Sequence, residues 1–297
     1  MPATARARAA RQRLRGAAVR RVQARVFITL TSDFGLHDPY VGIMKSRILQ
    51  RAPELCLVDL THEITPFQPE QAGYWLWCSY PQFPAGSVHV AVVDPGVGGA
   101  RSIVLLEAAG QRFVAPDNGL LGLIAQSSPD AIAYRLEPKA LSALGLSFAS
   151  ATFHGRDVMG PLGAELAAGR VRPQQLGERT ALLPGSLRPA VRIGAGFEGQ
   201  VAVVDRFGNA LTTIAAEAVR SIPDPQVALG AQRFPLVKTY AEARPDECVA
   251  LINSSSMLEL AVREGSAAAR LQLRPGAAVR VLPGSGGRGG GRRDGGR

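Results

Sequence analysis

Cysteine is scarce in this sequence of 297 residues, which contains only Cys56, Cys78 and Cys248. None of them forms a Cys-x-x-Cys pair, and an odd number leaves one thiol without a partner. This usage argues against a disulfide scaffold and against a zinc site. It favours a reducing compartment, which we expect to be the cytoplasm.

Long apolar runs are also missing. The chain has no apolar stretch of about 18 residues, so no transmembrane helix and no membrane partner are expected. The basic N-terminus lacks the continuous apolar segment and the cleavage site of a secretory signal. Nevertheless, 46% of the residues are hydrophobic, which excludes wholesale disorder and is enough for one large domain or two ordinary ones.

Acidic residues are missing from the N-terminal end, and the charge is therefore uneven. Residues 1–25 carry eight arginines and no acid, whereas residues 284–297 carry four arginines and one aspartate. The two ends together carry a charge of +11, and the whole chain carries +10. The body between them is therefore near −1. We expect both ends, one Arg/Ala-rich and one Gly/Arg-rich, to be disordered. A nucleic-acid partner is expected only if these arginine-rich ends provide the contact.

The first half of the body alternates apolar strands with helices. The segment Val88–Val93 is continuously apolar, which suits a strand buried on both faces of a parallel sheet. The pattern predicts an α/β domain over residues 26–185 with a central, mainly parallel sheet. The predicted elements are strands at 26–30, 55–60, 88–93, 102–106 and 112–115, and helices at 40–51, 69–78 and from 120.

Helical periodicity becomes rare after about residue 185, and Gly and Pro punctuate short apolar strands. This change predicts a smaller, mostly β, barrel-like domain over residues 195–283, joined through a linker at Pro184–Pro189. The predicted strands lie at 200–205, 210–214, 226–229, 247–252 and 278–282.

Three familiar motifs fail in their context. Asp33-Phe34-Gly35 matches the magnesium motif of kinases, but no catalytic loop of the kinase type precedes it. The glycines of 194–199 match a dinucleotide-binding pattern, but a strand follows them instead of a helix. The glycine-rich segment 94–99 lacks the Lys-Ser/Thr pair of a phosphate-binding loop.

Polar residues at the ends of apolar strands carry the stronger signal. In an open parallel sheet, ligands bind beyond the carboxyl ends of the strands. Each such residue alone is ordinary turn chemistry, but several together indicate a site. His154, between Phe153 and Gly155, lies in a polar loop from which an imidazole can reach a ligand. The strand-end residues are Ser32-Asp33, Asp59, Thr61-His62, Asp94 and Asp117-Asn118.

Six ordered segments resemble the S-adenosyl-L-methionine (SAM) hydrolases of the adenosine-forming type. These enzymes are also called SAM hydroxide adenosyltransferases and are related to the fluorinases and chlorinases. The resemblance spans the body from about residue 26 to 282. The segments are TSDFGLHDPYVGIMK (31–45), VDLTHEITPF (58–67), VHVAVVDPGVGGAR (88–101), VAPDNGLLG (114–122), TFHGRD (152–157) and DRFGNALTTI (205–214).

The resemblance implies that water attacks the ribose C5′ of SAM and releases adenosine and L-methionine. It maps the catalytic set onto Asp94, Arg101 and His154. A SAM-dependent halogenase, which forms a 5′-halo-adenosine, is the alternative that Asp94 and Arg101 disfavour. A non-catalytic nucleoside- or RNA-binding protein ranks last, because such a protein would not need an intact Asp/Arg/His set.

The resemblance also implies a substrate-binding set that is shared between the two domains. Asp33 is expected on the ribose diol, Phe207 and Asn209 on adenine, and Ser254 on methionine. Ser255 and Ser256 depart from the Arg-Gly of the halogenases, which leaves the contacts to the methionine carboxylate open. The resemblance further implies homotrimers with sites at subunit interfaces. SAM is the substrate, and no metal and no cofactor are expected. The full set is Asp33, Asp38, Tyr40, Phe67, Asn118, Phe153, Phe207, Asn209 and Ser254.

Overall fold

The computed structural model describes residues 26–284. The predictions for residues 1–25 and for the tail after Gly284 lie outside the described residues.

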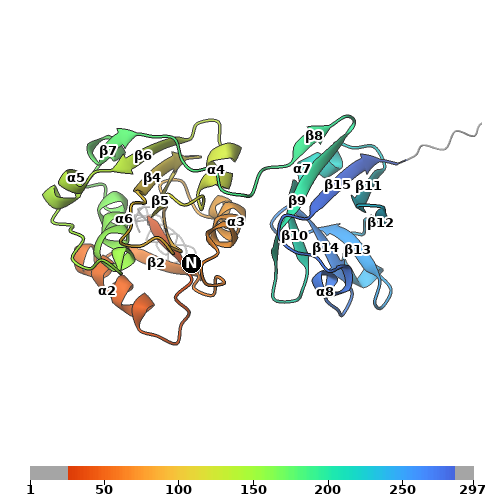
Figure 1. The fold of residues 1–297 in the computed structure, drawn as a ribbon, viewed down its shortest axis with the longest axis horizontal. Coiled ribbons are helices and arrows are strands. Elements are labelled where there is room, and N and C mark those ends of the chain that lie inside the picture. Colours follow the sequence, from red (N-terminus) through yellow and green to blue (C-terminus); the bar gives the residue numbers. More distant parts are fainter. Residues whose placement is uncertain (1–25, 285–297) are drawn as a thin grey trace, which may run out of the picture.

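A seven-stranded sheet forms the centre of the N-terminal part (Figure 1), with the order β2-β1-β3-β5-β4-β6-β7. Strands β2, β1, β3 and β5 are parallel neighbours, while β4 and β7 pair antiparallel with the strands beside them. The strands are β1 (Phe27–Ser32), β2 (Cys56–Thr61), β3 (Val88–Val92), β4 (Ile103–Ala108), β5 (Gln111–Pro116), β6 (Ile132–Leu136) and β7 (Gly177–Arg179).

Helices cover both faces of this sheet. On one face, α2 (Tyr40–Arg51), the π-helical segment η2 (Gly155–Met159) and α6 (Gly160–Ala167) share a core with Leu30 and Val90. On the other face, α3 (Pro69–Ser79) and α4 (Gly122–Ser127) pack against Val93 and Phe113. The predicted α/β class is therefore confirmed. Short elements complete this part: η1 (Tyr80–Gln82), α5 (Pro138–Ala143) and η3 (Pro173–Gln175).

A mostly antiparallel β sheet forms the C-terminal part, as predicted. Its order is β12-β11-β15-β9-β10-β14-β13, and β8 pairs with β9. A parallel bridge between Leu236, just after β12, and Ala250 in β13 brings the two edges together, so the sheet nearly closes into a barrel. The elements are β8 (Val191–Ile193), β9 (Gly196–Val204), β10 (Ala210–Ala215), α7 (Ala216–Arg220), β11 (Pro225–Leu229), β12 (Gln232–Phe234), η4 (Tyr240–Glu242), β13 (Cys248–Ile252), β14 (Met257–Val262), α8 (Ala267–Leu271) and β15 (Ala278–Pro283).

The two parts are connected by residues 180–190 and contact each other through α3. Tyr74, which is fully buried, packs with Leu187 of the connection and Leu211 of β10. Its hydroxyl donates a hydrogen bond of 2.9 Å to the carbonyl of Thr212, and burial raises its pKa well above the ordinary value. The phenol therefore stays neutral and keeps its donor.

Gly122, the first residue of α4, lies against this connection. A Cβ at Gly122 would lie 1.9 Å from the carbonyl oxygen of Pro184, which is shorter than any real contact. We expect Gly122→Ala to lower the free energy of unfolding by about 1–3 kcal/mol, because the backbone of 180–190 must move.

Gly42 in α2 provides a matched control, because a Cβ there would meet no atom within 4 Å. We expect Gly42→Ala to raise the free energy of unfolding by up to about 1 kcal/mol, through helix propensity. Chemical denaturation measures both changes. Equal effects of the two alanines would contradict the close approach at Pro184.

Candidate active site

Loops that follow β1 and β3 meet at one cavity. Asp33 comes directly after β1, and Asp94 follows two residues after β3. Because β1 and β3 are adjacent parallel strands, both loops leave the same edge of the sheet. We call the resulting cavity, of about 500 Å³, the acidic cavity. It is lined by Asp33, Phe34, Asp38, Tyr40, Pro66, Phe67, Val92, Asp94, Val97, Thr152, Phe153, His154 and Gly155.

A tight loop returns Arg101 to the side of Asp94. Successive turns within 94–99 fold the chain back on itself. Gly98 has a φ of +76°, and a Cβ on it would lie 2.5 Å from the carbonyl oxygen of Ala151. Only glycine fits this close approach. The glycine-rich segment that resembles a phosphate-binding loop therefore serves to bring Asp94 and Arg101 together.

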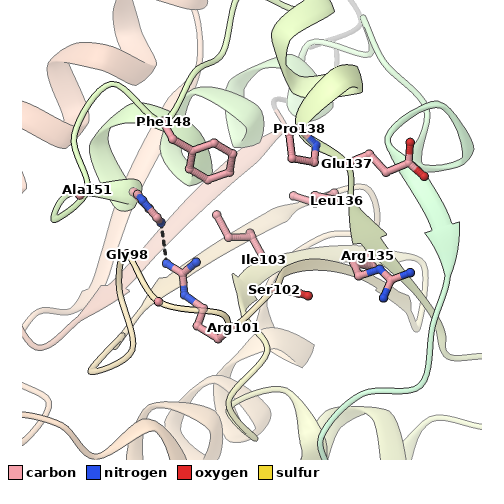
Figure 2. A pocket seen from close by; sticks show the side chains of 12 residues that line it. Gly98, Arg101, Ser102, Ile103, Arg135, Leu136, Glu137, Pro138, Phe148 and Ala151 are labelled. Atoms are coloured by element: carbon pink, nitrogen blue, oxygen red, sulfur yellow. Dashed lines mark hydrogen bonds between the residues drawn. The ribbon is translucent and has the colours of Figure 1, made fainter.

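Arg101 joins Asp94 to His154. Its Nε lies 3.0 Å from both carboxylate oxygens of Asp94, and its Nη2 also donates to Oδ2. The same Nη2 donates to Nδ1 of His154 at 2.7 Å (Figure 2). Arginine has no acceptor atom, so Nδ1 accepts, and the proton of the neutral imidazole is on Nε2. Within residues 26–284, no group accepts a hydrogen bond from Nη1 of Arg101.

The surroundings of His154 keep its imidazole neutral. Burial lowers the pKa of His154, and the nearby charge of Arg101 lowers it further, against the opposing charges of Asp94 and Asp157. The loop that carries His154 is closed by Asp157, which accepts from the backbone N–H of Ser150 at 3.0 Å. A hydrogen-bonded arginine beside a neutral, oriented imidazole can stabilise a developing oxyanion.

Asp33 lines the acidic cavity, and one of its two carboxylate oxygens already accepts a hydrogen bond from the protein. Oδ2 accepts a hydrogen bond of 3.0 Å from the backbone N–H of Phe67, a residue with a φ of 65°. No group in the described chain donates to Oδ1. A half-buried carboxylate with a free oxygen can accept hydrogen bonds from a sugar hydroxyl pair.

Aromatic rings form a second wall of the acidic cavity. The rings of Phe34, Tyr40 and Phe153 lie within 6 Å of one another, with centroid separations of 5.9, 5.5 and 5.7 Å. Phe67 lines the same cavity and is 68% exposed. Asp38 contributes a further carboxylate at the lining. Aromatic faces together with carboxylates favour a planar or cationic ligand.

The residues at the end of β2, Asp59 and His62, do not line the acidic cavity but hold the loop that carries Asp33, which does. His62 Nδ1 lies 2.7 Å from the hydroxyl of Ser32, next to Asp33, and its Nε2 lies 3.1 Å from Asp59. Lys45 of α2 donates to Asp59 at 2.5 Å. Burial alone would raise the pKa of Asp59, but the hydrogen bonds and charges of Lys45 and His62 outweigh it and lower that pKa. This cluster fixes the loop that carries Asp33.

Asn118, a member of the expected binding set, does not line the acidic cavity. Its amide donates to the carbonyl of Val93 at 2.8 Å, and its side-chain oxygen accepts from the backbone of Leu120. Asp117 accepts from the backbone of Leu183. At this strand end, local backbone groups occupy both side chains, which is the arrangement expected of turn residues.

The C-terminal members of the expected set lie in a separate cavity. Phe207, Asn209 and Ser254 line a cavity of about 790 Å³, which we call the C-terminal cavity, and Trp75 of α3 also lines it. Asn209 donates from Nδ2 to Asp205 at 3.1 Å, which leaves its oxygen as an acceptor for a ligand N–H. Apart from Asn118, the expected binding residues of one chain are thus divided between two cavities.

Glu259 is a buried residue of the C-terminal cavity that the sequence did not indicate. It lies in the middle of β14 and is 3% exposed. The hydroxyl of Tyr240 donates to it at 2.6 Å, and the amide of Asn253 donates at 3.2 Å. Burial raises the pKa of Glu259, against the effect of these two hydrogen bonds. Since Asn253 precedes Ser254, Glu259 positions the loop that carries Ser254. An acid inside an apolar strand gives no signal in a single sequence.

Comparison with known proteins identifies relatives along most of the chain. The SAM hydroxide adenosyltransferase N-terminal domain matches residues 28–177, and the C-terminal domain of the same family matches residues 199–280. A (R)-S-adenosyl-L-methionine hydrolase from Thermus thermophilus is 42% identical over 84% of this chain and 97% of the relative. A hydrolase of the same name from Methanocaldococcus jannaschii is 33% identical over 78% of this chain and 87% of the relative. A fluorinase from Nocardia brasiliensis is 25% identical over 88% of this chain and 98% of the relative.

Solved structures show the same fold. An uncharacterised conserved protein from Thermotoga maritima matches with a TM-score of 0.75 and 31% identity, covering 86% of this chain and 99% of that protein. A conserved hypothetical protein from Thermus thermophilus matches with a TM-score of 0.70 and 38% identity, covering 87% of this chain and 100% of that protein.

Residues 26–284 contain neither a metal-binding cluster nor a membrane-spanning helix. They hold no group of three or more His, Cys, Asp or Glu side chains arranged to bind a metal ion. No helix in the same range has the length and apolar character needed to cross a membrane.

Proposed function

The chain belongs to the SAM hydroxide adenosyltransferase family, and from this premise we propose that it hydrolyses SAM to adenosine and L-methionine. The observation that carries the proposal is the cluster of Asp94, Arg101 and His154 at the edge of the acidic cavity. The proposal is supported by SAM hydrolases that are up to 42% identical over most of the chain. The fluorinases are more distant, which makes halogenation the less supported alternative.

The acidic cavity suits the ribose and sulfonium of SAM. Its charged residues are Asp33, Asp38 and Asp94, whereas SAM carries a positive sulfonium. The aromatic faces of Tyr40 and Phe153 add attraction for a cation. In this arrangement, the free oxygen of Asp33 accepts from the ribose hydroxyls.

The catalytic cluster acts on the attacking water. The water oxygen bonds to C5′, the C5′–S bond breaks, and its electron pair leaves with sulfur as neutral methionine thioether. The leaving group needs no acid, so the protein's task is to align the water and stabilise its developing negative charge. Arg101 supplies that charge stabilisation, His154 orients the water through Nε2–H, and Asp94 holds Arg101 and takes up the proton. No residue role requires a cofactor or a metal.

Incubation of the purified protein with SAM tests the proposal. We expect equal amounts of adenosine and methionine, measured by chromatography. A 5′-chloro- or 5′-fluoro-adenosine as the main product in the presence of halide would favour the halogenase alternative. Binding of SAM without turnover would favour a non-catalytic protein.

Because the imidazole of His154 must be neutral, we expect kcat/KM to depend on pH on the acid side. Protonation of Nδ1 removes the acceptor for Arg101 and places a second positive charge beside it. Because the pKa of His154 is lowered, this loss occurs only as the pH falls below about 6.5, the ordinary value for histidine. We expect kcat/KM to fall below that pH, and His154→Gln to retain a lower rate without this transition. An acid limb in the wild type at or above the ordinary value would contradict the assignment.

We also propose that the chain acts as a homotrimer, with the C-terminal cavity of one subunit completing the acidic cavity of its neighbour. The division of the expected binding residues between two cavities of one chain supports this arrangement. The exposure of Phe67 and Phe207, at 68% and 77%, is consistent with surfaces that a neighbouring subunit covers.

Co-expression of two variants, each with one half of the site impaired, tests whether the site is shared between subunits. Arg101→Ala removes the water-activating cation from the N-terminal part, and Asn209→Ala removes a contact from the C-terminal part. Co-expressed subunits can combine two intact halves at some interfaces, so we expect activity well above the sum of the separate variants. Size-exclusion chromatography with light scattering reports the trimer. Mixed oligomers without recovered activity would place each complete site within one chain.

The cytoplasm is the proposed location. All three cysteines are free thiols in the structure, and Cys78 is buried, where burial raises its pKa to about 12. Such thiols suit a reducing compartment.

A further inference from the structure

A third cavity borders the catalytic cluster on the side away from the acidic cavity. This cavity, of about 540 Å³, is called the rear cavity (Figure 2). His154 lines both cavities, whereas Asp94 lines only the acidic cavity and Arg101 only the rear cavity. The hydrogen-bonded cluster therefore forms a partition between the two spaces.

The two cavities differ in charge more than in size. The rear cavity carries two arginines, Arg101 and Arg135, and one acid, Glu137. The charged residues of the acidic cavity are all aspartates. A sulfonium ion is repelled by the first environment and attracted by the second. SAM therefore belongs in the acidic cavity, and the rear cavity suits a small neutral molecule or one that develops negative charge.

Displacement at C5′ needs the nucleophile on the side opposite the leaving sulfur. With SAM in the acidic cavity, the partition stands between C5′ and the rear cavity. Arg101 lines the rear cavity, and its Nη1 has no partner among the described residues. We infer that the rear cavity admits the water nucleophile to Arg101 and His154, and that Phe148 is the wall that limits what can enter. This inference rests on the proposed function.

Phe148 is placed to act as that wall. Its ring packs edge-on against His154, with centroids 4.8 Å apart. It lines the rear cavity and is 41% exposed, so its truncation enlarges the space without opening a buried core. A phenyl ring makes no strong hydrogen bond, and it therefore confines a nucleophile without competing for it.

Blocking the rear cavity is the first test. Ser102 is half-buried and lines this cavity but not the acidic one. We expect Ser102→Phe to lower the single-turnover rate about tenfold or more, with the SAM dissociation constant within about threefold of the wild type. Ser142→Phe adds the same side chain at an exposed position of α5 outside the cavity and serves as the matched control. An unchanged rate, or a loss of SAM affinity equal to the loss of rate, would overturn the inference.

Enlarging the rear cavity is the second test, with methanol as the probe. The methanol oxygen bonds to C5′, methionine leaves with the electron pair of the C5′–S bond, and Asp94 takes up the hydroxyl proton, as it does from water. We expect Phe148→Ala to raise the ratio of 5′-O-methyladenosine to adenosine about tenfold. In a fitted pocket, one additional carbon changes the relative rate of two substrates by about this factor. Leu183→Ala truncates an exposed apolar side chain away from both cavities and should leave the ratio unchanged. An equal ratio in Phe148→Ala and the wild type would overturn the inference.

Failure of the inference and failure of the proposed function give different results. If the wild type produces no adenosine from SAM, the proposed function fails. If the wild type produces adenosine but neither Ser102→Phe nor Phe148→Ala alters rate or product ratio, only the route of the nucleophile is wrong.

Discussion

Replacing Arg101 with alanine is expected to lower the single-turnover rate of SAM cleavage about a thousandfold, or about 4 kcal/mol in barrier height. The guanidinium is the only cation hydrogen-bonded to both Asp94 and His154 among the described residues, and the developing charge on water depends on it. SAM affinity should stay within about threefold, because removal of a cation does not weaken the binding of another cation. Arg101→Lys keeps the charge but cannot make the forked contact, so we expect an intermediate rate.

Single-turnover kinetics and isothermal titration calorimetry separate the rate from the affinity. Arg179→Ala, at an exposed position of β7, is the control and should leave both unchanged. Asp94→Ala and His154→Ala should resemble Arg101→Ala, since the three side chains act as one hydrogen-bonded unit. A variant of Arg101 with wild-type rate would remove the cluster from the mechanism.

In contrast to Arg101→Ala, Asp33→Ala is expected to weaken the binding of SAM more than it lowers the rate of cleavage. The carboxylate is held by the backbone of Phe67 and offers its second oxygen to the ribose hydroxyls. A hydrogen bond to a charged group is worth about 1.5–3 kcal/mol, so the dissociation constant of SAM should rise about ten- to a hundredfold. Some loss of rate should accompany it, because a mobile ribose misaligns C5′ with the water.

Asp33→Asn is the conservative variant for this prediction. It retains an acceptor for Phe67 but loses the negative charge, so its affinity should lie between those of the wild type and Asp33→Ala. Calorimetry with SAM gives the dissociation constants. If Asp33→Ala bound SAM normally while Asp94→Ala did not bind it, the roles of the two carboxylates would be exchanged.

Periodic patterns in the sequence predict the elements that have one buried face. The helix predicted at 40–51 coincides with α2, because Val41, Met44 and Ile48 recur at helical spacing and are the buried residues of that helix. In contrast, α6 is buried on nearly every side, so its sequence lacks the apolar periodicity of a helix with one buried face. Strand β14 was missed for a related reason, because all six of its residues are buried and Glu259 interrupts the apolar run.

The candidate site depends on contacts that sequence spacing does not contain. Arg101 and His154 are 53 residues apart, and only the resemblance to a family grouped them before their hydrogen bond was observed. Strand-end reasoning identified Asp33 and Asp94 correctly as neighbours, since β1 and β3 are adjacent and parallel. Asn118 does not line the same cavity, because the same residue types also close turns, and the backbone of Val93 and Leu120 takes up this side chain.

Cleavage of SAM in ¹⁸O-labelled water tests the central claim most directly. If water held by Arg101 and His154 attacks C5′, mass spectrometry will find one label in the 5′-hydroxyl of adenosine and none in methionine. Labelled methionine, or adenosine without the label, would show that the oxygen enters elsewhere and would contradict the account.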